Sequence, residues 1–248
     1  MREWIKRHLP GPILRMRWRK YYWSEFNGNG EAELKELPGL VPPDKMAIDV
    51  GGSVGTYSFH LSRLAKSLVV FEPNPVLHWR FPKMNLPNAR LEKVALSDKP
   101  GRATLRVPAN SAQHGLASLE AHLSVSQPDA IEHDVEVRTI DSYSFENVGF
   151  VKIDTEGHEE AVLRGASDMI ARCHPTFLIE IEEVHNPGGL DRVNAFFKQR
   201  GYACTFFDAG QRKPFSEFDA TRDQNAALAA RGPGQRYINN FIFQHEGG

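Results

Sequence analysis

Residues 47–55 read Ala-Ile-Asp-Val-Gly-Gly-Ser-Val-Gly, and residues 69–73 read Val-Val-Phe-Glu-Pro. The first is a short apolar run that ends in glycines just before a helical pattern, and the second is an apolar run that ends in an acid. This order predicts a strand, a tight turn, a helix and a second strand, which open a nucleotide-binding α/β sheet. Glycine lets the backbone pass close to a ligand, and Glu72 stands where it can accept hydrogen bonds from both ribose hydroxyls.

The spacing of the glycines indicates which nucleotide binds. A dinucleotide fingerprint has glycines at its first, third and sixth positions, so that a pyrophosphate can sit on a helix N-terminus. Here those positions hold Gly51, Ser53 and Thr56, and no lysine follows to form a phosphate loop. The remaining Asp-x-Gly-x-x-x-Gly pattern suits a cofactor with a ribose and an amino-acid tail but no phosphate, which is S-adenosylmethionine. A purely structural turn is the alternative for the glycines taken alone.

The overall composition is that of a globular protein. The chain has 248 residues, of which 41% are hydrophobic and 25% charged, and a net charge of −1, which argues against a broad nucleic-acid surface. The two cysteines, Cys173 and Cys204, are too few for a disulfide framework, and their spacing matches no metal-binding motif. We therefore expect a reducing, cytoplasmic setting. No apolar run approaches the ~18 residues of a membrane span, and no signal peptide is expected.

The amino-terminal segment differs from the rest of the chain. Residues 1–23 carry seven Lys or Arg against one acid, and they hold three of the four tryptophans. This composition is typical of a helix on an anionic membrane surface, which would place the protein peripherally at the inner face of the membrane. The alternative is a pair of short helices, broken at residues 10–12, that packs on the domain and covers its cofactor cleft. We predict an arm over 1–44 and a catalytic domain over 45–248.

The rest of the chain alternates between strand and helix patterns, which predicts a doubly wound α/β sheet. Residues 108–133 show no clear period and are expected to form a long loop, and such loops are usually functional or disordered. The last two strands are expected to pair as an antiparallel hairpin across a polar loop. The expected strands are 46–51, 68–72, 90–96, 102–107, 135–140, 150–154, 176–182, 202–207 and 237–243, and the expected helices are 55–66, 75–85, 158–172 and 190–200.

Chemical groups concentrate where the predicted strand 150–154 ends. Residues 151–160 read Val-Lys-Ile-Asp-Thr-Glu-Gly-His-Glu-Glu, which places acids, a glycine and His158 at a strand-to-helix turn. Ligands of doubly wound sheets gather at the carboxyl ends of strands. Glu156 could be a simple capping acid, but Asp154 stands where an apolar strand opens into the cleft, so it is the stronger candidate.

Taken together, these motifs resemble the FkbM family of S-adenosylmethionine-dependent methyltransferases. The resemblance runs from about residue 47 to residue 182, with residues 152–159 the most specific segment. The sequence has Gly51, Gly52 and Ser53 where the family typically has Gly-Ala-Asn, which replaces an amide by a hydroxyl near the cofactor. The matching segments are Ile-Asp-Val-Gly at 48–51 with Gly55, Phe-Glu-Pro-Asn at 71–74, Ala-Leu-Ser-Asp at 95–98, Ala-Ser-Leu at 117–119, Thr-Ile-Asp at 139–141 and Lys-Ile-Asp-Thr-Glu-Gly-His-Glu at 152–159.

The resemblance implies a Rossmann-like class I methyltransferase fold and O-methyl transfer to hydroxyls of sugars, polysaccharides or other secondary metabolites. It implies that Asp49 accepts from the cofactor ammonium, either directly or through a water molecule. It also implies that Glu72 binds the ribose diol and that Pro73 and Asn74 border the adenine. The backbone at Ala95 is expected to read the adenine edge. The other expected cofactor contacts are Gly51, Gly52, Ser53, Gly55, Ser118 and Asp154.

Transfer to an alcohol also needs a base, because the hydroxyl proton must leave as the new bond forms. His158 has a suitable ordinary pKa of about 6.5, and Asp154 or Glu156 could orient it or act directly. The alternative is a divalent cation held by Asp154 and by Glu180 or Glu182, which would acidify the hydroxyl. We favour the mechanism without metal.

Two other functions share these sequence features. A nucleotide-dependent oxidoreductase would have the same fold but needs the missing pyrophosphate turn. A non-catalytic module associated with a membrane or a glycan would use the basic arm and keep the sheet as a scaffold. The expected partners of the enzyme are a small-molecule or glycan hydroxyl substrate and no nucleic acid.

Overall fold

The computed structural model describes residues 9–29, 31–110, 117–120, 129–224 and 237–247. Its strands are β1 (Met46–Val50), β2 (Ser67–Phe71), β3 (Ala89–Glu92), β4 (Ala95–Leu96), β5 (Gly101–Val107), β6 (Ile131–Arg138), β7 (Val148–Ile153), β8 (Thr176–Glu180), β9 (Tyr202–Asp208), β10 (Gln211–Pro214) and β11 (Asn240–His245). Its α-helices are α2 (Gly11–Ser24), α3 (Leu37–Leu40), α4 (Thr56–Leu64), α5 (Arg80–Met84), α6 (Glu159–Arg164), α7 (Ser167–Cys173), α8 (Gly189–Lys198) and α9 (Ala220–Asp223).

Within these residues, eight strands form the larger sheet in the order β10-β9-β11-β8-β7-β1-β2-β3. The neighbours from β8 to β3 are all parallel, whereas β11 is antiparallel to both β8 and β9. The predicted doubly wound sheet with five parallel strands and an antiparallel carboxyl-terminal pair is therefore confirmed. The pairing of Phe241 with both Ile179 and Phe206 shows that β11 lies between the two strands rather than at an edge.

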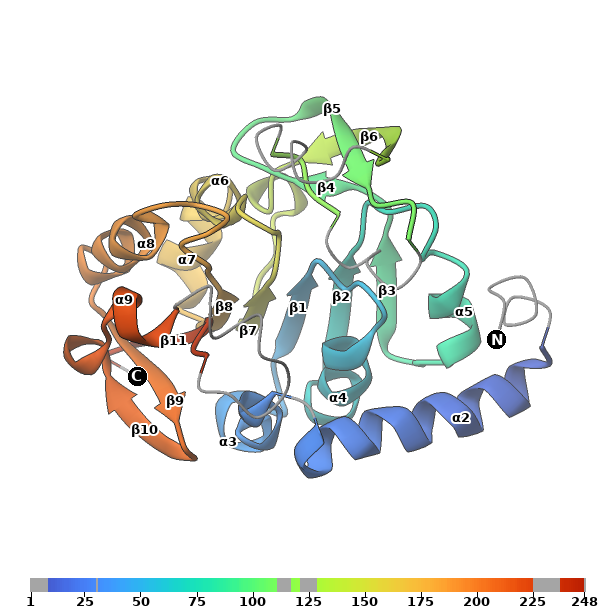
Figure 1. Ribbon diagram of the computed structural model, residues 1–248, viewed down its shortest axis with the longest axis horizontal. Helices are drawn as coiled ribbons and strands as arrows, with labels where there is room; N and C mark the ends of the chain where they lie inside the picture. The colour runs from blue at the N-terminus through green and yellow to red at the C-terminus, as the bar shows by residue number, and fades with distance from the viewer. Residues whose placement is uncertain (1–8, 30, 111–116, 121–128, 225–236, 248) are drawn as a thin grey trace.

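Alternate residues of the central strands enter two separate cores, because successive side chains of a strand point to opposite faces. Ile48 and Val69 belong to the core covered by α6, α7 and α8. Ala47 and Val70 belong to the core covered by α4 and α2. Helices thus lie on both faces of the sheet (Figure 1). All parallel strands end at the same edge, where β4, β6 and β5 form a small second sheet above the tips of β1, β2 and β7 (Figure 1).

Several predicted elements have different bounds in the structure. The expected strand 90–96 is divided between β3 in the large sheet and β4 in the small one. The expected helix 75–85 shortens to α5, whose carboxyl end is set by Asn85 at a left-handed φ of 54°. The expected loop 108–133 is shorter because β6 begins at Ile131 and pairs with the whole of β5. Parts of this loop, 111–116 and 121–128, lie outside the described residues.

The expected helix 158–172 is broken into α6 and α7 around Gly165. A Cβ at Gly165 would lie 2.1 Å from the carbonyl oxygen of Ser97, so the missing side chain lets the two backbones meet. The Gly165 carbonyl accepts from the amide of Asp141. The break therefore attaches the small sheet to the helical layer, and a continuous helix is the wrong prediction.

The arm contains one long helix in its described part. On α2, Leu14, Trp18 and Tyr22 are buried at helical spacing against α4 and α5. The arm contributes none of the residues that line the cleft described below, so the described residues pack on the domain without covering the cleft. The expected helix before Pro10 lies outside the described residues. No helix in the described part of the chain is long and apolar enough to cross a membrane.

Candidate active site

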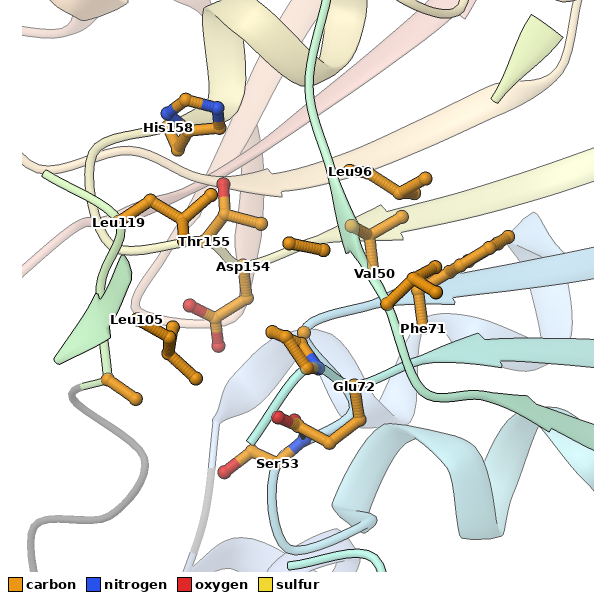
Figure 2. A pocket seen from close by; sticks show the side chains of 15 residues that line it. Val50, Ser53, Phe71, Glu72, Leu96, Leu105, Leu119, Asp154, Thr155 and His158 are labelled. Atoms are coloured by element: carbon orange, nitrogen blue, oxygen red, sulfur yellow. Dashed lines mark hydrogen bonds between the residues drawn. The ribbon is translucent and has the colours of Figure 1, made fainter. Parts of the chain in front are cut away.

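A cleft lies at the carboxyl ends of β1, β2 and β7, beneath the small sheet. It contains about 580 Å³ of space when its open mouth is included. Figure 2 shows the carboxylates of Glu72 and Asp154 turned toward this space, which Leu105 borders on its other side. The lining residues are Val50, Gly51, Ser53, Phe71, Glu72, Pro73, Val94, Ala95, Leu96, Leu105, Ala117, Leu119, Asp154, Thr155 and His158.

Gly51 is required where β1 turns into the cleft. It has a left-handed φ of 81°, and a Cβ there would lie 1.8 Å from the carbonyl oxygen of Asp154. Its amide donates to the carbonyl of Phe71 at 2.9 Å. Glycine thus lets the ends of β1, β2 and β7 come together, as the sequence predicted for a turn that admits a ligand.

Glu72 is held in one orientation by the backbone. Its Oε2 accepts from the amide of Ser53 at 2.6 Å and its Oε1 from the amide of Asn74 at 2.7 Å. Each oxygen keeps a second lone pair, since an ionised carboxylate has about four acceptor sites. Burial raises the pKa of Glu72 to about 7, although the two amide donors oppose the shift. The carboxylate is thus fixed where a diol can reach it.

Four of the expected cofactor contacts have structural roles in the described residues. Gly52 and Gly55 make room for Val70 and Met84, whose side chains a Cβ would overlap. Asn74 Oδ1 accepts from the amide of Val76 at 3.0 Å, and Asn74 itself is fully buried. Ser118 Oγ donates to the carbonyl of Glu156 at 2.8 Å. None of these four residues lines the cleft.

Asp49 also stays out of the cleft lining. It is buried inside the molecule, and its Oδ2 accepts from the hydroxyl of Ser58 at 2.5 Å. Burial raises its pKa to about 6, while the Ser58 hydrogen bond and the charge of Lys152 lower it. Its carboxylate therefore supports the first turn of α4 from behind, and direct contact with a cofactor ammonium stays a prediction.

The sequence predicts only some of the apolar residues that line the cleft. Phe71, Pro73 and Ala95 lie at or just after the ends of predicted strands, and all three line the cleft. Leu105 and Leu119 line it too, although they come from β5 and the segment after it. A flat apolar slot suits an adenine ring. The only sequence signal for this wall was the Ala-Ser-Leu segment at 117–119.

Asp154 directly follows β7 and lines the cleft. Burial raises its pKa above the ordinary value, the ammonium of Lys152 opposes the shift, and the nearby carboxylates add to it. Lys152 is fully buried on β7, two residues earlier, and its Nζ donates to Asn240 Oδ1 at 2.9 Å. A carboxylate whose pKa is displaced upward at the mouth of a cleft is suited to exchange a proton with a bound ligand.

His158 has both ring nitrogens engaged by the protein. Its Nδ1 lies 2.7 Å from Glu120 Oε1 and its Nε2 lies 2.9 Å from Ser97 Oγ. The orienting contacts expected from Asp154 or Glu156 are instead made by Glu120, for which no sequence motif gave a signal. His158 thus joins the turn after β7 to the segment 117–120 and to the end of β4.

A polar network extends from Asp154 along the ends of β8 and β11. Asn239 Nδ2 donates to Glu180 at 2.7 Å and to Glu182 at 3.1 Å. His185 Nδ1 lies 3.0 Å from Glu156 and 3.5 Å from Glu182. Glu156, expected to act on His158, is thus turned to His185, whose pKa it raises.

The arm completes this network on its other side. Glu31 Oε2 accepts from the hydroxyl of Tyr57 at 2.5 Å and from Asn240 Nδ2 at 3.0 Å. No pattern in the sequence marks Glu31, because its partner Asn240 is distant in the chain. We name as the polar rim the connected set of Tyr57, Glu31, Asn240, Lys152, Glu180, Asn239, Glu182, His185 and Glu156.

These residues fit an adenosyl donor without phosphates. The turn at Gly51 admits a close ligand, Glu72 presents a fixed diol acceptor, and apolar walls flank the slot. Within the described residues, no lysine or arginine that could neutralise a pyrophosphate lines the cleft. Comparison with family models gives a match to the Methyltransferase FkbM domain over residues 49–204. The chain belongs to the FkbM methyltransferase family.

Solved structures include several similar to this FkbM chain. A methyltransferase FkbM from Methylobacillus flagellatus KT is 16% identical, with a TM-score of 0.49, 86% of this chain covered and 50% of that one. The present chain thus spans half of that protein. A putative methyltransferase from Streptococcus mutans in complex with SAH is 12% identical, with a TM-score of 0.45 and coverages of 85% and 93%. A putative rRNA-methylase from Clostridium thermocellum is 12% identical, with a TM-score of 0.48 and coverages of 86% and 94%. No curated protein sequence matches significantly.

The alternative metal ligands of the FkbM chain have other partners. Glu180 lies 3.8 Å from Lys152 Nζ and accepts from Asn239, and Glu182 shares the same amide. Among the described residues, no three His, Cys, Asp or Glu side chains are grouped so that they could hold a metal ion. The FkbM family is described as a family of methyltransferases.

Proposed function

We propose that this FkbM protein transfers the methyl group of S-adenosylmethionine to a hydroxyl of a sugar, a polysaccharide or another polyhydroxylated metabolite. The observation that carries the proposal is the polar rim next to Asp154. Its carboxylates and amides accept and donate hydrogen bonds in a chain, and such groups are the ones that recognise hydroxyls. A site built to bind hydroxyls also rejects analogues that lack them.

In the proposed cofactor site, Glu72 binds the ribose hydroxyls, and Phe71, Pro73 and Leu96 enclose the adenine. Gly51 and Ser53 provide backbone close to the amino-acid tail. When bound, S-adenosylmethionine supplies an electrophilic methyl group on a sulfonium and leaves as a neutral thioether. The protein's main contribution is then alignment of the acceptor oxygen with that methyl group.

Asp154 is the proposed catalytic base. Its carboxylate takes the proton of the acceptor hydroxyl as the oxygen forms its bond to carbon. The raised pKa of Asp154 brings its basicity nearer to neutral pH than that of an ordinary aspartate. His158, whose two nitrogens are held by Ser97 and Glu120, is a positioning residue. Glu156 holds His185 at the rim.

The experiment incubates the protein with isotopically labelled methyl donor and a panel of polyols, activated sugars and polysaccharide extracts. Product mass and NMR spectra should locate the label on oxygen. Asp154→Asn should bind S-adenosylhomocysteine within a few-fold of wild type by calorimetry while turnover falls by about 10²–10⁴-fold. Label on nitrogen or carbon, or full turnover by Asp154→Asn, would contradict the proposal.

The proposed reaction needs no metal ion. Turnover should therefore survive a chelator, and titration with magnesium should change it little. Complete loss of turnover with a chelator and recovery with magnesium would instead support the site of Asp154, Glu180 and Glu182, in which a cation acidifies the hydroxyl.

A further inference from the structure

The three helices α2, α4 and α5 carry basic side chains and no acidic ones. These three helices contain no Asp or Glu, while the whole chain has a net charge of −1. In Figure 1, α2 and α4 lie at the end of the molecule opposite the small sheet, and α5 lies beside β3 above α2. The cations of the three helices are Arg15, Arg17, Arg19, Lys20, Arg63, Arg80 and Lys83.

A groove runs between α2 and α4 on this surface. It contains about 750 Å³ of space when its open mouth is included, and it is lined by Arg15, Arg19 and Arg63 together with apolar side chains such as Met16 and Phe59. Within the described residues, no carboxylate pairs with any of these three guanidinium groups. Burial and the charge of Arg19 lower the pKa of Arg63. The groove thus brings three guanidinium groups together with no carboxylate partner among the described residues.

The solvent side of α2 carries exposed apolar side chains from its first turn to its last. Opposite the buried stripe of Leu14, Trp18 and Tyr22, the helix presents Ile13, Met16 and Trp23, which are 43%, 69% and 39% exposed. Lys20 lies in the same stripe, since positions 13, 16, 20 and 23 share one helical face. Apolar side chains flanked by arginines are the arrangement of a helix that lies in the interface of a bilayer.

We propose that α2 docks on the surface of an anionic lipid bilayer. Ile13, Met16 and Trp23 enter the interfacial region, and the groove of Arg15, Arg19 and Arg63 receives lipid phosphates. Nucleic acid is the other polyanion that such charge could attract. The exposed Met16 and Ile13 favour lipid, because phosphate backbones gain nothing from an apolar stripe.

The test is co-sedimentation of the full chain with two kinds of vesicle, phosphatidylcholine alone and phosphatidylcholine mixed with phosphatidylglycerol. Binding should require phosphatidylglycerol and weaken as salt is raised. Each basic residue near the surface is expected to contribute about fivefold in affinity. Arg15→Gln with Arg19→Gln should thus weaken binding roughly 25-fold, and adding Arg63→Gln roughly 100-fold.

The matched control removes three charges elsewhere, as Lys99→Gln, Arg102→Gln and Lys198→Gln, and should bind within a few-fold of wild type. Met16→Ser keeps every charge and should still weaken binding. Circular dichroism melting and donor binding should be unchanged in the arginine variants and in Met16→Ser, which would show that weaker binding does not come from a folding defect. Equal binding to neutral vesicles, no binding at all, or equal losses in the α2 and control variants would overturn the proposal. The proposal would also be overturned if Met16→Ser bound the vesicles as well as wild type and single-stranded RNA displaced the protein from the vesicles.

Discussion

Glu72 contacts the backbone turns and is proposed to bind the cofactor. Replacing it with glutamine removes its charge and keeps its shape. In Glu72→Gln, an amide NH₂ must replace one oxygen that accepts from Ser53 or Asn74. Loss of a charged acceptor typically costs about 1.5–3 kcal/mol, so affinity for S-adenosylhomocysteine should fall by roughly 10- to 100-fold. Calorimetry measures this directly. Glu132→Gln, on β6, is the control; unaltered affinity in Glu72→Gln would rule out the ribose assignment.

His158 offers a test of positioning against catalysis. Its imidazole joins Glu120 and Ser97, and Leu119 beside Glu120 lines the cleft. Without the ring, the 117–120 segment loses its anchor, so His158→Ala should raise the KM for the donor several-fold more than it lowers kcat. Glu120→Gln should show the same pattern more weakly. If turnover instead fell by about a hundredfold or more while KM stayed unchanged, His158 would be the base.

At the level of helices, α2 is attached mainly by its aromatic side chains. Trp18 is 9% exposed, and its ring centroid lies 5.9 Å from that of Trp79. Trp18→Ala should therefore lower the free energy of unfolding by about 3–5 kcal/mol, the usual result of truncating a buried aromatic. Met16→Ala, on the exposed side of the same helix, should change it by less than about 0.5 kcal/mol. Urea unfolding measures the stability of both variants. Equal losses in the free energy of unfolding would contradict this packing.

Elements with strong local patterns were predictable, and those fixed by distant contacts were not. β1 and β2 are apolar runs bounded by glycine and acid, so their type and order followed from the sequence. The break at Gly165 depends on the carbonyl of Ser97, which is remote in the chain. β6 is amphipathic, and only its pairing with β5 extends it back to Ile131. Periodicity carries no information about such partners.

The site shows the same division. The structure brings to one cleft five residues at or just after the ends of predicted strands, namely Ser53, Glu72, Pro73, Ala95 and Asp154. Glu31, Glu120 and Asn240 arrive from segments with no motif, because they are fixed by tertiary contacts. Asp49 was assigned to the cofactor by resemblance, yet its carboxylate faces Ser58. Strand-end rules therefore located the cofactor side of the cleft but not its polar rim.

Buried acids throughout the molecule make its stability depend on pH. Burial raises the pKa of Glu33 and Glu72 to about 7 and that of Asp49 to about 6. An unfolded chain releases these protons near pH ~4. Between the unfolded pKa and the folded pKa of each acid, the unfolded state binds fewer protons than the folded state. The free energy of unfolding therefore falls as pH rises through this interval. The loss from each group is complete above its folded pKa.

The ligand-free protein should accordingly be less stable at about pH 7.5 than at about pH 5.5, and Glu72 alone should account for about 2 kcal/mol of that difference. Glu72→Gln removes this titration, so its urea unfolding curves should differ less between the two pH values. Glu132→Gln, which removes an exposed acid, should keep the wild-type dependence. An identical pH dependence in wild type and Glu72→Gln would show that Glu72 is ionised in the folded ligand-free protein. The raised pKa of Glu72 also predicts that affinity for the cationic donor increases from about pH 6 to about pH 8, as the Glu72 carboxyl loses its proton. If Glu72 were already ionised in the ligand-free protein, donor affinity would gain nothing from this rise in pH.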